Sequence, residues 1–257
     1  MSSCLPHDTM SSSSHAAHAA ASLRVALARR RGRPLALFGI PITLDISWPF
    51  AFALSTWTFA DSVLPAAAPG RGLAAYTSAG IVVAGLLLLS LALHEAAHGL
   101  AARQAGVGVI GVSLSMFGGA TTLRDVPRTP GAVFRIAVAG PLASLVCALF
   151  AIFVHVVLVE NDGDPLSIAG AAVVAMVNLV VAVINLLPGR PLDGGHILEA
   201  AVWKVTGRPA RAAKLATAAG RTIGAVAIGI ALIASASGDV AAALWLGLLG
   251  LVIWSAE

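Results

Sequence analysis

The sequence predicts an α-helical membrane protein with about six transmembrane helices and a short membrane-associated β segment after the second. Three observations predict this class. Hydrophobic residues make up 58% of the 257-residue chain, charged residues only 11%, and the mean hydropathy is +0.90, whereas about a quarter of the residues in soluble domains are charged. Six apolar runs approach the roughly 17 to 25 residues that a transmembrane helix needs. The basic residues gather in alternate connections between these runs.

The chain is predicted to begin with a disordered basic tail at residues 1–34, followed by one intramembrane domain at residues 35–257. The tail is rich in Ser, Ala and His and ends with the basic cluster at residues 29–33. This cluster comes too late for a cleaved secretory signal. His7, His15 and His18 could bind a metal loosely, but a low-complexity tail is favoured. The two cysteines, Cys4 and Cys147, exclude a disulfide framework.

The apolar runs predict helices at residues 48–64, 81–102, 133–159, 168–187, 222–235 and 240–254. The last two runs are the shortest and would form a hairpin about Ser237-Gly238-Asp239, which is a turn-type sequence. Between the second and third runs, residues 109–117 alternate and are rich in β-branched side chains, and a turn follows at Gly118-Gly119. A strand and a plain connector are equally compatible with residues 108–122. If it is a strand, its free edge could pair with a substrate backbone.

The distribution of positive charge predicts the orientation. If the N-terminus is cytoplasmic and six spans follow, only Arg71 of the 16 Lys and Arg residues lies outside. Such a bias places both termini in the cytoplasm and the chain in the cell membrane. The acidic residues Glu160, Asp162 and Asp164 then lie on the outer side. Because topology explains the basic residues, and because they are spread over separate loops, we expect no nucleic-acid partner.

The second apolar run contains His94-Glu95-Ala96-Ala97-His98. Two histidines four residues apart lie on one face of a helix, so both can bind one Zn²⁺ while the glutamate between them activates water. Alternatively these are satisfied core residues. That alternative is disfavoured because ionisable groups inside a membrane are costly unless they are paired, metal-bound or in a wet cavity.

A hydrolytic zinc usually has three protein ligands, and Asp193 is the candidate for the third. It follows the fourth apolar run, in a segment where Pro188 and Pro191 interrupt helical hydrogen bonding and Gly194-Gly195 permit close backbone approach. The predicted orientation brings Asp193 and the histidines to a similar depth, nearer the cytoplasm. A simple loop with Asp193 as an N-cap is the alternative.

These motifs resemble the site-2 protease family of intramembrane zinc metalloproteases. The resemblance rests on His94, Glu95 and His98 in H-E-x-x-H and on Asn185, Pro188, Asp193 and Gly194 in N-x-x-P-x-x-x-x-D-G. It extends to three short motifs: Gly39-Ile40-Pro41, Phe117-Gly118-Gly119 and Ala139-Gly140-Pro141. It implies a metalloprotease domain at residues 35–257 with one Zn²⁺ per chain, held by His94, His98 and Asp193. The chain shows neither an inserted PDZ domain nor a CBS pair, so it is most similar to the six-span branch without them.

The resemblance also implies roles and partners. Glu95 is the expected general base, and Asn185 is the candidate oxyanion donor, with a structural hydrogen bond as an equal alternative. The expected partners are the lipid bilayer and a single-span substrate, such as an anti-sigma factor or a membrane-held transcription factor. The oligomeric state stays open.

His196 is favoured as a solvated residue at the start of a helix, and the alternative is that it is a partner of the zinc site. The rival function is metal binding or transport without hydrolysis, which needs no general base between the histidines.

Overall fold

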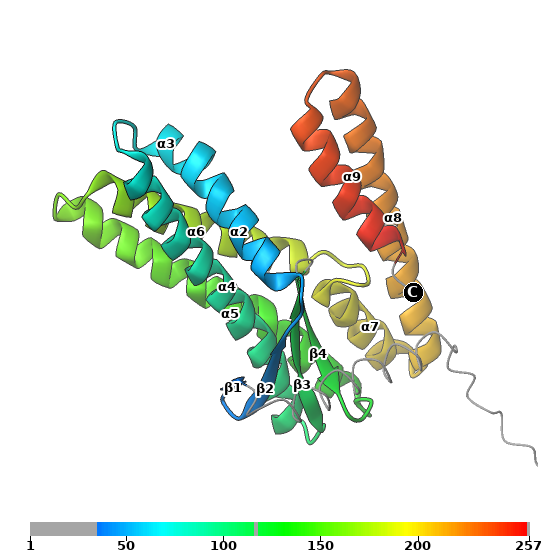
Figure 1. Ribbon diagram of the computed structural model, residues 1–257. Helices are drawn as coiled ribbons and strands as arrows, with labels where there is room; N and C mark the ends of the chain where they lie inside the picture. The colour runs from blue at the N-terminus through cyan, green and yellow to red at the C-terminus, as the bar shows by residue number, and fades with distance from the viewer. Residues whose placement is uncertain (1–34, 116–117, 256–257) are drawn as a thin grey trace, which may run out of the picture.

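The computed structural model describes residues 35–115 and 118–255, so the predicted tail and Phe117 lie outside the described part of the chain. The strands are β1 (Leu35–Leu37), β2 (Ile40–Leu44), β3 (Val109–Ser115) and β4 (Gly118–Leu123). The helical elements are α2 (Trp48–Thr58), the π-helical turn η1 (Phe59–Val63), α3 (Leu64–Ala67), α4 (Leu73–Gln104), α5 (Pro130–Glu160), α6 (Pro165–Asn185), α7 (Asp193–Thr206), α8 (Pro209–Ala236) and α9 (Val240–Ser255). Figure 1 shows α2 to α6 as one bundle, with the sheet and α7 at one end of it.

Four helices of the described chain are long and apolar enough to cross a membrane: α4, α5, α6 and α8. They correspond to the second to fifth predicted runs, although α6 ends two residues before the predicted end at 187. The prediction of a polytopic helical protein is therefore confirmed, but the count of six spans is not. The first run lies in α2, η1 and α3, which follow one another without a gap from Trp48 to Ala67, and α9 has only 16 residues. Pro65 accounts for the π-helical turn, because it has no amide hydrogen to donate to the preceding turn.

The helix α5 illustrates how the bundle is packed. It buries small residues and exposes large apolar ones. The buried residues include Ala137, Gly140, Ser144, Ala148 and Ala151. The exposed residues include Leu142, Val146, Leu149, Phe150 and Phe153. In a bilayer the helices associate through close contact of small residues, while large apolar side chains are solvated by lipid. The packing of α5 is therefore that of a membrane helix.

The predicted β segment is confirmed, but it belongs to a larger sheet than the sequence indicated. The strand order is β1-β2-β3-β4, in which β2 and β3 are parallel and the outer pairs antiparallel. The free edge predicted for the segment at residues 108–122 does not lie on β3, because Val112 of β3 pairs with Ile42 on one side and Thr121 on the other. Within the described sheet, the second part of this segment, β4, is the outer strand.

The sheet lies against α4 close to the predicted metal ligands. Ile40, Val112 and Leu114 are buried in one apolar cluster with Ala92, which lies two residues before His94. Burial of these side chains fixes the sheet on α4, because a large apolar side chain contributes about 1.5–3 kcal/mol when it is fully buried. The sheet is thereby held beside the His94 to His98 turn.

Two loops that were predicted to share one side of the membrane lie at the same end of the bundle. Arg71, before α4, forms an ion pair with Asp164, which caps the N-terminus of α6. The sheet and α7 lie at the opposite end (Figure 1). The alternation of chain direction through α4, α5 and α6 is therefore the predicted one.

The predicted C-terminal hairpin is also confirmed. The helices α8 and α9 are joined by a turn in which Gly238 has a φ of +86°, a value that favours glycine. Within the described chain, α8 packs mainly against α9 and α7. Figure 1 shows the hairpin leaning away from the α2 to α6 bundle. The hairpin therefore joins the body mainly through α7 and the loop before it.

Candidate metal centre

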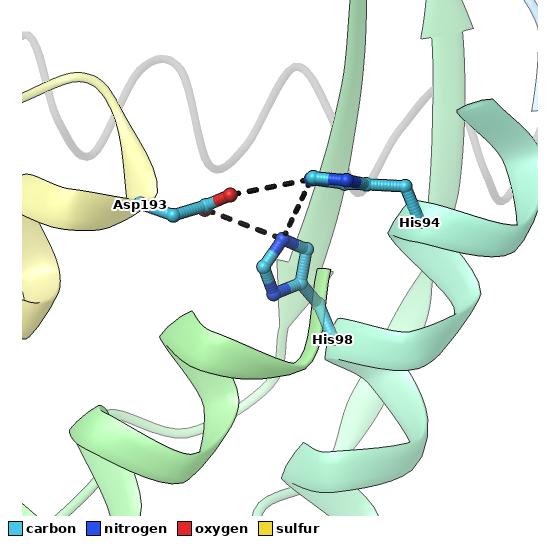
Figure 2. A group of neighbouring side chains, drawn as sticks. All are labelled: His94, His98 and Asp193. Carbon is cyan, nitrogen blue, oxygen red and sulfur yellow. Dashed lines mark hydrogen bonds and ion pairs between the residues drawn. The ribbon is translucent and has the colours of Figure 1, made fainter. Parts of the chain in front are cut away.

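The two histidines of the motif lie on one face of α4, as their spacing predicted. Both side chains are buried, with residue exposures of 3% for His94 and 7% for His98. Their Nε2 atoms are 3.2 Å apart and face the same point (Figure 2). Four residues complete about one helical turn, so the two side chains lie one above the other on α4, and their rings meet edge to face at an angle of 77°.

Each imidazole is held through its other nitrogen by α5. Nδ1 of His98 donates to the carbonyl oxygen of Ile136 at 2.7 Å, and Nδ1 of His94 lies 2.8 Å from the hydroxyl oxygen of Ser144. A carbonyl can only accept, so Nδ1 of His98 carries the hydrogen and the Nε2 lone pair is left for a metal. Ser144 could not be singled out from the sequence, because a serine in an apolar helix has many possible partners.

Asp193, the first residue of α7, completes the cluster as predicted. Its Oδ2 lies 3.2 Å from Nε2 of His94, and its Oδ1 lies 3.2 Å from Nε2 of His98. Figure 2 shows the carboxylate reaching the two rings from the α7 side. Burial would raise the pKa of Asp193, but its contacts with His94 and His98 lower it. The carboxylate form, which is the form that binds metals, is therefore favoured.

The three groups fit a tetrahedral zinc ion. Ligands about 2.0–2.1 Å from a tetrahedral zinc lie roughly 3.3 Å from one another. The two Nε2 atoms are 3.2 Å apart, and each lies 3.2 Å from a different oxygen of Asp193. One ligand atom from each residue gives a set whose members all lie within 4.8 Å of one another. Two imidazoles and one carboxylate leave a fourth position for water or substrate, as in hydrolytic zinc sites. His94, His98 and Asp193 are the group in the described chain whose donor atoms converge in this way.

Close packing by α5 also shapes the site. A Cβ placed on Gly140 would lie 2.2 Å from Nε2 of His98 and 2.5 Å from Nε2 of His94. Any side chain at this position would occupy the space where the metal and its ligands meet. Gly140 belongs to the Ala139-Gly140-Pro141 motif, so the resemblance had indicated its importance without giving its role.

Glu95 is buried beside the histidines and is held by the sheet. The hydroxyl of Thr121 on β4 lies 2.8 Å from Oε2 of Glu95 and 2.9 Å from its main-chain oxygen. Its single hydrogen can be donated to only one of these at a time. Thr121 was not singled out from the sequence, because only the tertiary structure brings β4 to Glu95.

Two other candidate residues, Asn185 and His196, bond to residues outside the metal cluster. The amide of Asn185 donates to the carbonyl of Val181 at 3.1 Å, one turn back along α6, so its oxyanion role stays a prediction. His196 is 43% exposed, and its Nδ1 lies 3.4 Å from Oε2 of Glu199. It is thus a partly solvated residue in the first turns of α7, as favoured. The buried Asn178 likewise bonds its own helix, at Val174.

An apolar groove of about 810 Å³ runs between α4, α5 and α6. It is lined from Asp164 and Ser78 at one end to Ser90 and Leu93, next to His94, at the other. Most of its lining is apolar, as expected for a surface that meets hydrocarbon rather than water.

The fold and the site define a membrane-embedded protein with a zinc-binding centre of the hydrolytic type. The sequence profile of Peptidase family M50 matches residues 82–164 and 167–227, which include all three candidate ligands. This match covers more than half of the chain. The chain therefore belongs to Peptidase family M50 and contains the zinc metalloprotease domain of that family.

Individual relatives agree with this assignment. Rip3 of Mycobacterium tuberculosis is 39% identical over 215 residues, which cover 83% of this chain and 53% of that protein. The corresponding values for sll0528 of Synechocystis sp. are 34% over 197 residues, 76% and 50%. Both have zinc metalloprotease in their names. The chain spans about half the length of these two relatives.

A solved structure shares the fold. The Site-2 Protease from Methanocaldococcus jannaschii aligns with a TM-score of 0.55 and 25% identity, covering 87% of this chain and 91% of that one. The resemblance to the site-2 protease family is thus confirmed. The rival interpretation as a metal transporter is not favoured by the family match or by this likeness.

Proposed function

We propose that the protein is a zinc-dependent intramembrane endopeptidase that cleaves membrane-tethered regulatory proteins near the cytoplasmic face. The observation that carries the proposal is the convergence of His94, His98 and Asp193 at 3.2 Å separations, with Glu95 adjacent in sequence to His94. By resemblance, the substrate is a single-span protein such as an anti-sigma factor or a membrane-held transcription factor.

The residues divide into ligands and a base. His94, His98 and Asp193 would hold the ion, which when bound supplies Lewis-acid chemistry that makes water a competent nucleophile near neutral pH. Glu95 accepts the proton of the attacking water and delivers it to the leaving amine nitrogen. The hydroxyl of Thr121 keeps the Glu95 carboxylate in place. Asn185 would donate to the oxyanion after its side chain turns away from Val181.

The experiment compares purified full-length variants in lipid nanodiscs. Glu95→Gln is expected to abolish cleavage of a tethered substrate, a loss of roughly 10²–10⁴-fold or more, while it keeps one zinc per chain. Ala at His94, His98 or Asp193 should remove both zinc and activity. Metal analysis decides the roles: loss of zinc in Glu95→Gln with retention in Asp193→Ala would refute them. Zinc uptake into sealed vesicles without hydrolysis would favour the transport rival.

The edge of β4 supports a role in substrate binding. β4 is the outer strand next to β3, and its Thr121 contacts the proposed base. A substrate segment added to this edge would lie extended beside Glu95, and its backbone hydrogen bonds would replace those lost when its helix unwinds.

A disulfide crosslink tests this edge. The exposed Ala120 on β4 is changed to Cys in the Glu95→Gln background, and single cysteines are placed near the cut site of the substrate. Crosslinking is expected at Ala120→Cys and not at Ala36→Cys, which lies exposed on β1 at the opposite edge. Equal crosslinking of both variants would contradict strand addition. A substrate with Leu in place of Gly at the cut site should be cleaved more slowly, since Leu stabilises its helix.

The proposed orientation places both termini in the cytoplasm of the cell. It is supported by the charge bias and by the ion pair that joins Arg71 and Asp164 at one end of the bundle. A reporter that is active only in the cytoplasm should function when fused after Arg128 or Lys214 and fail after Asp162. Activity at all three fusion sites would exclude this topology.

A further inference from the structure

Among the described residues, the proposed metal ligand Asp193 has no anchoring partner comparable to those of the histidines. Both of its oxygens face the Nε2 atoms of the metal cluster. The position of its carboxylate is therefore set by the backbone of the loop from Leu186 to Leu192, which leads into α7. This loop has turns and bends rather than a regular hydrogen-bonded structure. Something outside the loop must hold it in place.

The loop is seated on α8 through its backbone. The amide of Arg190 donates to the carbonyl of Ala216 at 3.1 Å. A Cβ on Gly220 would lie 1.9 Å from the carbonyl oxygen of Arg190, so the two backbones are in direct contact. These contacts fix one side of the loop, three residues before Asp193.

The side chain of Arg190 fixes the other side. Its guanidinium donates to Oε2 of Glu199 in α7, and the same oxygen faces Nδ1 of His196. The Arg190 and Glu199 side chains are only 27% and 12% exposed. Burial would raise the pKa of Glu199, but the hydrogen bond from His196 and the charge of Arg190 lower it. The pair is therefore charged and largely shielded from solvent. It links residue 190 to residue 199, and Asp193 lies in the segment between them.

We infer that Arg190 and Glu199 are positioning residues for the zinc ligand Asp193, because their ion pair clamps the loop to α7 while the Arg190 backbone is seated on α8. This inference rests on the proposal that Asp193 binds zinc. Partners that orient metal ligands typically contribute about 10- to 100-fold in metal affinity. Neither residue touches the metal cluster, so their effect is exerted through the loop.

The test measures zinc affinity of the full chain in nanodiscs by competition with a chromophoric chelator, together with the visible spectrum of the Co²⁺-loaded protein. Arg190→Met and Glu199→Gln are each expected to weaken zinc binding by about tenfold and to change the Co²⁺ spectrum. The double variant should be no worse than either single one, because both remove the same interaction. Arg190→Lys keeps the charge and should restore most of the affinity. The matched control is Arg71→Met, which removes the ion pair with Asp164 at the other end of the bundle and should leave both readouts unchanged.

Two outcomes would overturn the inference: wild-type affinity and spectrum in Arg190→Met, or the same loss in Arg71→Met as in Arg190→Met. If Arg190→Met does not fold, the zinc affinity and Co²⁺ spectrum of Glu199→Gln and Arg190→Lys test the inference, since both substitutions conserve side-chain size. Asp193→Ala is measured alongside. Wild-type zinc affinity in that variant would reject the ligand assignment itself, whereas its loss combined with a normal Arg190→Met would reject only the clamp.

Discussion

His94 and His98 lie within the 32-residue helix α4, and each ring is held by a second partner on α5. Asp193 instead begins a 14-residue helix after an irregular loop, and that loop is held by α7 and α8. The histidines are thus fixed by helix geometry inside the bundle. Asp193 is fixed by tertiary contacts at the end of the bundle. Substitutions around the histidines should therefore act directly on the ligands, whereas substitutions around the loop should act through a backbone that can adjust.

The largest effect is expected from Gly140→Ala. The new methyl group would lie 2.2 Å from Nε2 of His98, and neither α4 nor α5 can move aside without disturbing the bundle. Zinc affinity should fall by more than the roughly 10- to 100-fold typical of substitutions outside the ligands. Gly131→Ala on the same helix has open space around its Cβ and serves as the control. Normal zinc content in purified Gly140→Ala would show that His94 and His98 can shift to make room for the methyl group and still bind zinc.

A smaller effect is expected from Gly220→Ala on α8. Its methyl group would displace the Arg190 carbonyl and hence the loop, but the loop can relax. We expect about a tenfold loss of zinc affinity and a larger loss of cleavage than of substrate binding, because a misplaced ligand affects the reaction itself. Gly229→Ala, also on α8 and with nothing near its Cβ, should match the wild type. Wild-type zinc affinity and cleavage in Gly220→Ala would mean that contact of the loop with α8 does not set the position of Asp193.

Ser144→Ala removes the hydroxyl beside Nδ1 of His94. The ring keeps its place in the packed bundle but loses the partner that fixes its tautomer, so a loss of about tenfold in zinc affinity is expected. Ser90→Ala is the comparison, since Ser90 lies one turn earlier on α4 and donates to the Leu87 carbonyl in its own helix. A loss in Ser90→Ala equal to that in Ser144→Ala would argue against a specific role for the His94 partner.

Removing zinc with a chelator should abolish cleavage but change the backbone structure only slightly, and the change in amide hydrogen exchange should be uneven. Amide hydrogen exchange is expected to rise in residues 186–195 and to stay low in residues 94–98, because the intrahelical bonds of α4 do not depend on the metal. Equal increases in both segments would contradict the proposed contrast between the histidines and Asp193.

The sequence by itself determined the class of protein and pointed to the candidate ligands. Apolar runs indicated membrane helices because a bilayer leaves no other partner for the backbone of a spanning segment. The His94 to His98 spacing predicted one helical face because the period of the α-helix is fixed. The strand at residues 109–115 and the turn near Gly238 followed from local preferences of the chain.

Only the tertiary structure decided what lies around those ligands. The pairing of β3 on both sides, the contact of Thr121 with Glu95 and the clamp from Arg190 to Glu199 all join residues distant in sequence or held by a loop. Such contacts depend on how elements pack, and many residues could have made them. The first run illustrates the same limit, because its hydropathy indicated one helical run but not the π-helical turn that precedes Pro65 within it. Periodicity fixes which face a residue occupies, and packing alone decides what that face meets.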